Sequence, residues 1–362
     1  MKTGLNHAVQ VTVAALSIVL GLGTAVPAAA QCPGDVTGNG QVNGADLGLV
    51  LAAWASDGTD QPGSDVNEDG IVNGADLAYV LSAWGNCPAD GIVRAWGRND
   101  YGQCNIPADL GPCTAIAGDL FHTVALRTDG IVRAWGVNNY GQCNIPADLG
   151  PCIAVAGGFA HTVALRTDGI VRAWGVNDAG QCNIPTDLGP CIAIAGGHDH
   201  TIALRIDGIV RAWGYNYHGQ CNIPADLGPC TAIAGGGYHT VALRTDGIVR
   251  AWGYNEYGQC NIPADLGPCI AVDGAYVHTV ALRTDGIVRA WGYNYDGQCN
   301  IPADLGPCTA IAGGYYHTVA LRTDGIVRAW GWNGFGQCNI PADLGPCIAI
   351  AGVGNHVIAI TK

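Results

Sequence analysis

The chain of 362 residues carries a formal net charge of −13, and charged residues make up only 12% of it. Its 55 glycines, beside three phenylalanines and one methionine, argue against a long-helix or coiled-coil protein and favour a fold with many tight turns. The acidic balance argues against nucleic acid as a partner, because phosphates need a basic footprint. The 16 cysteines indicate an oxidising compartment.

Residues 1–30 have the pattern of a secretory signal peptide. Lys2 precedes an uncharged apolar stretch from Val11 to Gly23, and three alanines end at Ala30, before Gln31. The apolar stretch is shorter than the roughly 20 residues that a membrane anchor needs. We therefore expect a secreted protein, extracellular or associated with the cell surface, with no membrane span after signal cleavage.

Two loops of twelve residues, 35–46 and 65–76, place oxygen-bearing residues where a calcium loop needs them. Glycine at position 6 makes the sharp turn, and position 7 contributes its carbonyl oxygen whatever its side chain. The sequence therefore predicts two Ca²⁺ sites, whose ligands come from Asp35, Thr37, Asn39, Gln41, Asn43 and Asp46 in the first loop and from Asp65, Asn67, Asp69, Ile71, Asn73 and Asp76 in the second. At the ligand positions the second loop has three carboxylates and the first has two, so we expect the second loop to bind Ca²⁺ more tightly.

Each loop is followed by an apolar run of helical character, over residues 47–54 and 77–84. Duplicated loops with Asp at position 12, each followed by one helix, resemble the dockerin domain. The resemblance implies a small α-helical domain over residues 31–88 that docks, with calcium bound, onto a cohesin-type scaffold or a cell-surface protein. The positions that would select the cohesin, 44–45 and 74–75, are Gly-Ala in both halves, which would permit two binding orientations. A disulfide between Cys32 and Cys87 would clasp the ends of this domain.

The rest of the chain, residues 89–362, consists of seven copies of a 39-residue repeat. The sequence Gly-Ile-Val-Arg-Ala-Trp-Gly begins at Gly91, Gly130, Gly169, Gly208, Gly247, Gly286 and Gly325. In each copy, Asp-Gly separates two β-favouring runs, which predicts a hairpin. A further strand is expected in segments such as 113–118. Three or four short strands per copy, with no helical pattern, predict the blades of an all-β propeller.

The two ends of the repeat region favour a closed ring over an open solenoid. The strand expected at 92–96 lacks a preceding partner in its own copy, and the last copy ends just after residues 356–360, which correspond to that partner. The two ends can therefore complete one hairpin and close a seven-bladed ring with no exposed edge.

Two segments of each repeat, such as Trp135 to Gln142 and Ala117 to Leu126, resemble the regulator of chromosome condensation repeat. The archetype of that family is a nuclear guanine-nucleotide exchange factor that binds chromatin. Its secreted bacterial relatives are binding proteins, and one of them inhibits β-lactamases. Export and acidity favour the second kind for this chain.

Residues that recur in all seven copies are expected to hold the scaffold together. This applies to the tryptophans from Trp96 to Trp330 and to the histidines His122, His161, His200, His239, His278, His317 and His356. We expect Arg94 and its equivalents to pair with the turn aspartates, such as Asp129. Because the cysteine spacing fits neither zinc nor redox catalysis, one disulfide per blade is predicted: Cys104/Cys113, Cys143/Cys152, Cys182/Cys191, Cys221/Cys230, Cys260/Cys269, Cys299/Cys308 and Cys338/Cys347.

The copies differ in two windows, one of four residues after Trp-Gly (98–101 and its equivalents) and one of three residues before the histidine (119–121 and its equivalents). Hairpin geometry puts both windows at the same end of a blade. Of the 16 Tyr and Phe residues, all but Tyr79 fall in these windows. Aromatic loops on a rigid scaffold are typical of binding faces. Leaving aside positions where the family often carries an aromatic (Tyr101, Tyr140, Tyr257 and Phe335), the predicted ligand-binding residues are Tyr215, Tyr217, Tyr238, Tyr254, Tyr276, Tyr293, Tyr295, Tyr315, Tyr316 and Trp332.

Three functions remain open on the sequence. The first is a secreted non-catalytic protein whose aromatic face recognises a protein or a glycan. The second is a polysaccharide-active hydrolase, or a component of a carbohydrate-degrading complex, whose candidate residues are His198, Asp199 and His218 and the possible carboxylate pair Glu256 and Asp296. The third, guanine-nucleotide exchange, rests on fold analogy alone.

Overall fold

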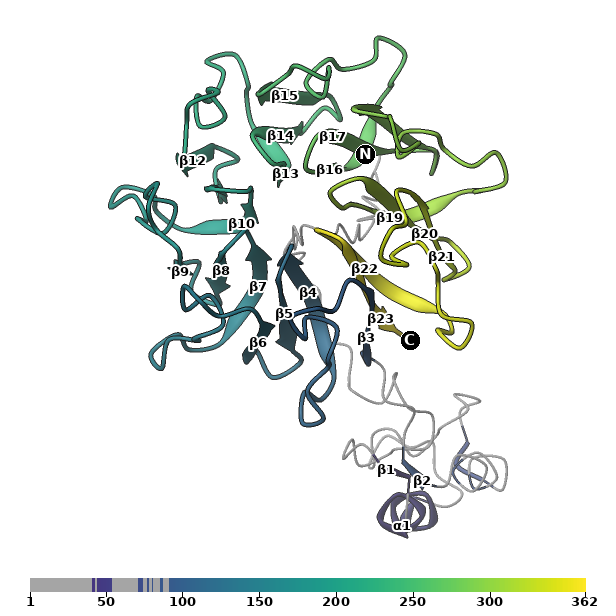
Figure 1. Cartoon of the computed structure of the whole chain (residues 1–362). Coiled ribbons are helices and arrows are strands. Elements are labelled where there is room, and N and C mark those ends of the chain that lie inside the picture. Colours follow the sequence, from purple (N-terminus) through teal and green to yellow (C-terminus); the bar gives the residue numbers. More distant parts are fainter. Residues whose placement is uncertain are drawn as a thin grey trace, which may run out of the picture. The chain divides into compact units, whose positions relative to one another are not determined.

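The computed structural model describes residues 41–42, 44–53, 71–73, 77, 80, 85–86 and 91–362. Residues 91–362 belong to one compact unit, and the described residues between 41 and 86 belong to another. The larger unit is a ring of seven antiparallel sheets of three strands each, arranged around a central axis (Figure 1). The predicted all-β propeller is therefore present, with three strands in every blade.

Each blade has an inner, a middle and an outer strand. The inner strands lie nearest the axis of the ring and are β4 (Cys113–Asp119), β7 (Cys152–Gly157), β10 (Cys191–Gly196), β13 (Cys230–Gly235), β16 (Cys269–Gly274), β19 (Cys308–Gly313) and β22 (Cys347–Val353). The middle strands are β5 (His122–Arg127), β8 (His161–Arg166), β11 (His200–Arg205), β14 (His239–Arg244), β17 (His278–Arg283), β20 (His317–Arg322) and β23 (His356–Thr361). The outer strands are β3 (Val93–Gly97), β6 (Val132–Gly136), β9 (Val171–Gly175), β12 (Val210–Gly214), β15 (Val249–Gly253), β18 (Val288–Gly292) and β21 (Val327–Gly331).

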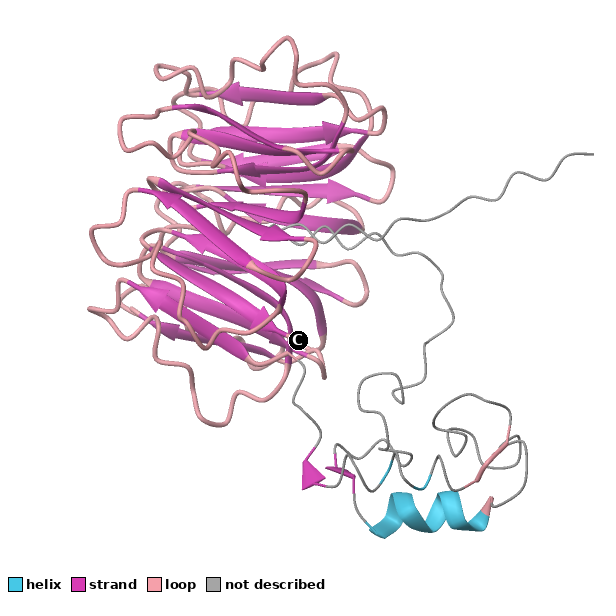
Figure 2. Cartoon of the chain, turned by 90° about the vertical axis from the view of Figure 1, so that its right-hand side faces the viewer, coloured by secondary structure: helices cyan, strands magenta, loops and turns pink. Residues whose placement is uncertain are grey.

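The hairpin between the middle and outer strands has the turn that Asp-Gly predicts. Gly130 has a φ of 81°, a conformation that costs glycine little, and Asp129 Oδ1 accepts a hydrogen bond from the backbone N–H of Ile131 at 3.1 Å. Loops gather at the two ends of the ring, because the strands of all the blades run between these ends (Figure 2). We call the end that carries these hairpin turns the turn face.

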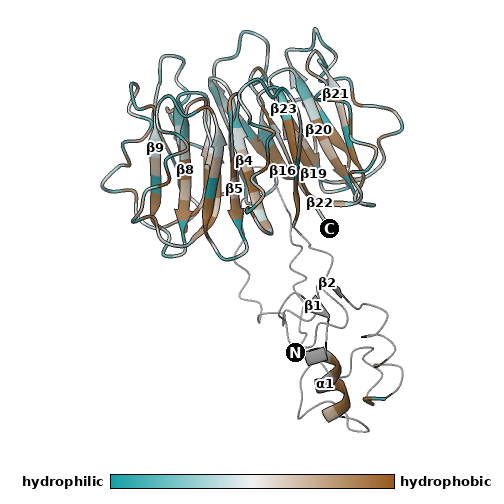
Figure 3. Ribbon diagram, turned by 60° about the horizontal axis from the view of Figure 1, so that its bottom comes forward, coloured by the Kyte–Doolittle hydropathy of each residue, from teal (hydrophilic) through white to brown (hydrophobic). Residues whose placement is uncertain are grey.

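The hydrophobic core lies between neighbouring blades. One cluster, for example, joins Val124 and Val132 of one blade to Val155 and Ala164 of the next. The inner strands, such as β16 and β22, are largely hydrophobic (Figure 3). A three-stranded sheet has two apolar faces to bury, and stacking in a ring buries both of them in every blade.

Recurring polar residues connect the blades, as predicted for scaffold positions. Gln103 precedes the first complete blade, and its carbonyl oxygen accepts hydrogen bonds from Trp135 Nε1 at 2.9 Å and from Thr123 Oγ1 at 2.8 Å. His122 Nε2 lies 3.1 Å from Oγ1 of Thr162 in the next blade. All seven histidines are completely buried, where they pack between blades.

The ring closes as the chain ends predict. The C-terminal β23 pairs with the N-terminal β3, with His356 opposite Gly97 and Ile360 opposite Val93. Trp96 Nε1 donates to the carbonyl oxygen of Gln337 at 3.0 Å and so repeats the link between blades across the closure.

The prediction that the outer-strand arginines pair with the turn aspartates is wrong. Arg133 pairs with Asp109 of the preceding loop, at 3.0 Å, and the turn residue Asp129 instead pairs with Arg127 at 2.8 Å. Likewise Arg94 pairs with Asp343. Arg127 ends the strand that leads into the turn, two residues from the carboxylate, so it reaches Asp129 locally and leaves the outer-strand arginine to the neighbouring loop.

The predicted disulfide pairing within each repeat is also wrong, because all 14 cysteines of residues 91–362 are free thiols. Cys113 lies opposite Arg127, at the turn face. Cys104 follows Gln103, which contacts Thr123 at the other end of the same strand. Four strand residues separate these ends by about 13 Å, whereas disulfide-bonded Cα atoms lie within roughly 7 Å.

The same separation applies to the remaining predicted pairs, Cys143/Cys152, Cys182/Cys191, Cys221/Cys230, Cys260/Cys269, Cys299/Cys308 and Cys338/Cys347. Burial raises the pKa of the Cys104 thiol to about 12 and that of Cys113 to about 11, so neither forms the reactive thiolate near neutral pH. Cys32 and Cys87 lie outside the described residues.

In the smaller unit, α1 (Gly44–Ala52) overlaps the first predicted helical run. Strands β1 (Gln41–Val42) and β2 (Gly85–Asn86) pair antiparallel, which joins the two ends of the unit. Val50, Val72 and Val80 form a small apolar cluster with Ala53, so the two halves of the duplicated sequence share a core. Most of the second helical run lies outside the described residues.

Candidate binding face and axial cavity

Strand register brings the two variable windows of each blade to one end of the ring. His122, which begins β5, lies opposite Gly136, which ends β6. The backbone N–H of Val137, in the window after Gly136, donates to the carbonyl oxygen of Phe121, in the window before His122, at 2.8 Å. The same bond recurs in the other blades, for example from Tyr215 to Asp199. We call the surface that these windows form the variable face.

A constant frame supports the variable tips. Asn99 Nδ2 donates to Asn105 Oδ1 at 2.8 Å across the first loop, and Gln103 Oε1 accepts from the backbone N–H of Tyr101 at 3.0 Å. Gly102 between them has a φ of 76°. The frame recurs in the other six loops, so the side chains at the tips can differ while their backbone keeps one shape.

The aromatic rings on this face form one continuous network. Tyr276 stacks on Tyr315 with a centroid distance of 4.2 Å, and Tyr293 contacts Tyr316 at 5.5 Å. Through such contacts, between 4.2 and 6.4 Å, the network includes all ten predicted ligand-binding residues: Tyr215, Tyr217, Tyr238, Tyr254, Tyr276, Tyr293, Tyr295, Tyr315, Tyr316 and Trp332. The most exposed of these are Tyr217 and Tyr295, at 82% and 87%.

The network extends beyond the predicted crescent. Tyr101, Phe121, Phe159 and His198 continue it through the first blades, with Phe159 stacked on His198 at 4.2 Å. Arg98 joins its two ends, because its guanidinium carbon lies 4.9 Å from the ring of Phe335 and 5.4 Å from that of Phe121. Tyr257 and Phe335, set aside on family grounds, contribute contacts as well. We call this closed circuit the aromatic belt.

Inside the belt, the inner strands and the adjoining windows line an axial cavity of about 90 Å³ that is partly open to solvent. Its wall is largely backbone: a Cβ at Gly157 would lie 2.6 Å from the carbonyl carbon of Gly118, so the inner strands approach too closely for most side chains. Five larger polar or aromatic side chains nevertheless line the cavity, those of Asp119, His198, Asp273, Tyr276 and Tyr315.

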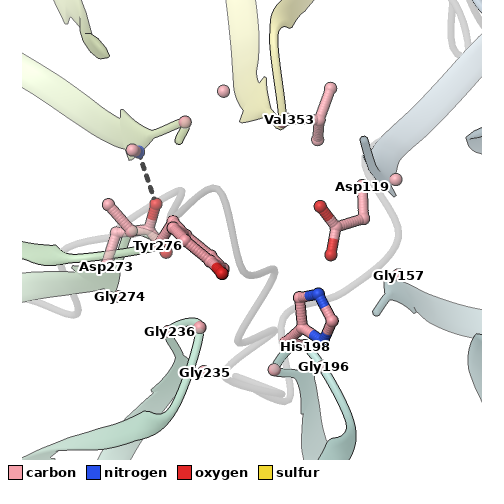
Figure 4. Close-up of a pocket in the computed structure, with 18 of the residues that line it drawn as sticks. Asp119, Gly157, Gly196, His198, Gly235, Gly236, Asp273, Gly274, Tyr276 and Val353 are labelled. Carbon is pink, nitrogen blue, oxygen red and sulfur yellow. Dashed lines mark hydrogen bonds between the residues drawn. The ribbon is translucent and has the colours of Figure 1, made fainter. Parts of the chain in front are cut away.

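Two carboxylates lie on opposite sides of the cavity, and that of Asp273 is turned toward the neighbouring inner strand. Asp119 points toward the ring of His198, and Asp273 lies across from them and accepts a hydrogen bond from the backbone N–H of Gly313 at 2.6 Å (Figure 4). Burial raises the pKa of Asp119 to about 6 against the opposing effect of His198, and burial raises the pKa of Asp273 to about 7. Both carboxylates are therefore poorly compensated when ionised.

Among the residues considered for catalysis, His198 and Asp199 are in direct contact, and His198 and His218 both contact the ring of Tyr238. His198 Nδ1 and Asp199 Oδ2 lie 2.6 Å apart; burial alone would raise the pKa of Asp199, but the bond and charge of His198 lower it. His218 instead packs among tyrosines, 4.8 Å from the ring of Tyr254. Glu256 accepts a hydrogen bond from Tyr254 Oη at 2.8 Å, which raises the pKa of that tyrosine.

Among the described residues, no Ser, Thr, Cys or Lys lines the axial cavity. In the part of the chain that the structure describes, no group of three or more His, Cys, Asp and Glu side chains could hold a metal ion. Nor do the described residues contain a helix that is long and apolar enough to cross a membrane.

Of the predicted calcium ligands, the structure describes Gln41, Ile71 and Asn73 and places Asp46 in α1. Asn73 Nδ2 donates to the carbonyl oxygen of Ile71 at 2.9 Å, which folds the end of the second loop on itself. The other predicted ligands, Asp35, Thr37, Asn39, Asn43, Asp65, Asn67, Asp69 and Asp76, lie outside the described residues. The donor chemistry of carboxylate, amide, hydroxyl and main-chain oxygens fits Ca²⁺.

Comparison with solved structures supports the propeller fold. The chain is similar to Prp20p of Saccharomyces cerevisiae, at 18% identity and a TM-score of 0.66 over 76% of this chain and 92% of that one. Human WBSCR16 matches at 19% identity and a TM-score of 0.64, over 75% and 98% of the two chains. The CRINKLY WD40 ectodomain of the Arabidopsis thaliana receptor kinase ACR4 matches at 18% identity and a TM-score of 0.58, over 69% of this chain and 93% of that one. At these identities the likeness concerns the fold alone.

Sequence families identify both parts of the chain. The regulator of chromosome condensation (RCC1) repeat matches residues 117–142, 152–181, 191–220, 230–259, 276–298 and 308–337. The dockerin type I domain matches residues 33–83. No curated protein matches the chain. The chain thus carries a dockerin type I domain followed by a propeller of RCC1 repeats, as both sequence resemblances predicted.

Proposed function

We propose that this chain is a secreted, non-catalytic interaction protein whose propeller captures another protein on the variable face. The aromatic belt is the observation that carries the proposal. It places tyrosine, phenylalanine and tryptophan rings on one end of a ring whose frame is otherwise almost identical from blade to blade. Large aromatic side chains supply contact area at a small cost in conformational entropy and are enriched among the residues that dominate binding energy.

The packing of the belt favours a protein over a glycan as the ligand. Many of its rings meet edge to face, as do Tyr257 with Tyr293 and Trp332 with Phe335. In such pairs the edge of one ring covers the face of the other, so fewer open ring faces remain for stacking on a flat sugar. An irregular surface of ring edges and hydroxyl groups suits a protein surface, which brings its own apolar and hydrogen-bonding groups.

The dockerin domain would tether the propeller. Dockerin type I domains bind calcium and cohesins, so we propose that residues 31–88 hold two Ca²⁺ ions and dock onto a cohesin-type protein on a scaffold or cell surface. The oxygen-rich loops 35–46 and 65–76 would supply the ligands, and bound Ca²⁺ would offset the repulsion among their carboxylates. The domain would fix the protein in place while the variable face stays available.

Replacing Tyr217 and Tyr295 together with alanine tests the proposal. Both rings are more than 80% exposed, so their removal should leave the melting temperature unchanged while lowering partner affinity at least tenfold. The matched control replaces Ile248 and Ile287, about half exposed near the turn face, with alanine. Capture from culture medium with and without calcium, in parallel with a glycan array, identifies the ligand, and calorimetry with the purified ligand gives the affinities.

Equal loss of affinity in both double variants would contradict the proposal, because it would show that the variable face contributes no more to binding than the turn face does. A glycan as the only ligand would replace the protein partner with a sugar. Hydrolysis of that glycan, lost on replacing His198 or Glu256, would establish an enzyme in place of a binding protein.

A further inference from the structure

The propeller distributes its charges unevenly between its two ends. Residues 91–362 contain 14 arginines and 20 acidic residues. Every arginine forms an ion pair with an aspartate, as Arg127 does with Asp129 and Arg133 with Asp109. All of these pairs except Arg98–Asp100 join residues of the turns, strands and connecting loops that recur in each repeat. The scaffold is therefore close to neutral.

Six acidic residues of this unit have no arginine partner, and each lies in a variable window or in the axial cavity: Asp119, Asp178, Asp199, Glu256, Asp273 and Asp296. The scaffold does not require them. At the position of Asp119 the other blades have glycine four times, alanine once and valine once, and at the position of Asp273 they all have alanine. The negative charge is thus a property of the variable face and its cavity.

The cavity itself has the features of a site for a cation. It is several times larger than the roughly 10–15 Å³ that one water molecule needs. Tyr276 and Tyr315 stack on one another at one side, and His198 lies 5.9 Å from the ring of Tyr276. Aromatic rings attract cations, most strongly where water is excluded. The burial that raises the pKa of Asp119 and Asp273 is a cost that a bound cation would offset.

We infer that the axial cavity receives a basic side chain, lysine or arginine, from the partner protein that the variable face binds. This inference rests on the proposed function. The carboxylates of Asp119 and Asp273 would pair with the ammonium or guanidinium group, and the rings of Tyr276 and Tyr315 would flank it. The partner therefore has a basic contact surface with at least one long cationic side chain at its centre, and the other acidic residues of the face attract that surface at longer range.

The test measures binding of a peptide of alternating lysine and glycine to the full chain by calorimetry at low ionic strength. The same peptide with acetylated lysines is the neutral control, and an arginine–glycine peptide is the second cationic probe. We expect both cationic peptides to bind and the acetylated one not to bind. Binding should weaken as salt is added. The cationic peptide with the higher affinity shows whether the cavity prefers lysine or arginine.

Asp119→Gly and Asp273→Ala restore residues that other blades carry, so both variants should fold. Each should weaken peptide binding at least tenfold. Two control variants remove one negative charge outside the cavity: Asp178→Asn on the variable face and Asp129→Asn on the turn face. Their affinity for the peptide should stay within twofold to threefold of the wild-type affinity. Equal binding of the acetylated peptide, or equal effects of Asp119→Gly and Asp178→Asn, would overturn the inference. If the tyrosine double variant loses partner capture but the cationic peptides do not bind the wild-type chain, the proposed function is supported and the inference of a basic side chain in the cavity is wrong.

Discussion

One buried residue, Val357, interrupts a pattern that the other six blades keep. In each of those blades a histidine Nε2 meets a threonine hydroxyl of the next blade at 2.9–3.1 Å. His317 has valine at the corresponding position, and both of its ring nitrogens are buried without a hydrogen-bond partner among the described residues. An unsatisfied buried polar group costs stability, so this is a weak point between the last two blades.

Val357→Thr should therefore stabilise the propeller by about 1 kcal/mol, the net value of a typical buried hydrogen bond. Differential scanning calorimetry should show a melting temperature higher by a few degrees. Val357→Ala, which removes apolar contacts and adds no hydroxyl, should lower it. A threonine variant that melts no higher than the alanine variant would show that the hydroxyl does not reach His317.

Single residues also mark the limit of what the sequence could predict. The Asp-Gly turns and the recurring tryptophans and histidines depend on local chemistry repeated seven times, and their positions followed from the pattern. The cysteine pairing could not be predicted in this way. Two cysteines nine residues apart can close a small loop, but they can equally lie near opposite ends of a strand. Asp273 is one departure from alanine in a repeated strand, and only the ring geometry shows that it lines a cavity with Asp119.

At the scale of elements, β23 has a special role because it closes the ring. It supplies the middle strand of a blade whose outer strand, β3, lies at the other end of the sequence. Fully buried Val357 and Ile358 of β23 belong to the two core clusters on either side of that blade. The two terminal strands could be paired from sequence because each lacked a hairpin partner, whereas the number of strands in a blade was left at three or four.

Deleting residues 355–362 should abolish folding of the whole propeller, because it removes the middle strand of the closing sheet and exposes two core clusters. Size-exclusion chromatography and tryptophan fluorescence should show an aggregated or unfolded chain. The matched control is a circular permutant, with residues 1–90 kept in front, that joins Lys362 to Gly91 and starts within the turn 128–131. It retains every strand and should fold. A truncated chain that melts cooperatively at the wild-type temperature would refute the closing role of β23.

At the scale of the whole molecule, seven buried histidines make stability depend on pH. Burial lowers their pKa values to between about 3 and about 4, well below the roughly 6.5 of an exposed histidine. The unfolded chain therefore binds more protons than the folded one below pH 6.5. Asp119 and Asp273 act in the opposite direction, because their pKa values are raised, but they are only two groups.

We therefore expect the free energy of unfolding to fall as pH drops from about 7 to 5. Each uncompensated group contributes up to about 1.4 kcal/mol per pH unit, so the net loss should reach several kcal/mol per unit below pH 6. Urea unfolding followed by tryptophan fluorescence, with calcium saturating throughout, measures it. A midpoint that stays constant or rises on acidification would contradict the burial of neutral histidines in the folded state.

We assign recognition to the variable face and support to the rest of the propeller. Hydroxyl-radical footprinting of the purified protein with and without its captured ligand tests this assignment most directly. We predict that bound ligand protects Tyr217 and Tyr295 from oxidation and leaves Ile248 and Ile287, near the opposite end, as reactive as in the free protein. Protection of the isoleucines with unchanged tyrosines would place the ligand on the turn face and contradict the account.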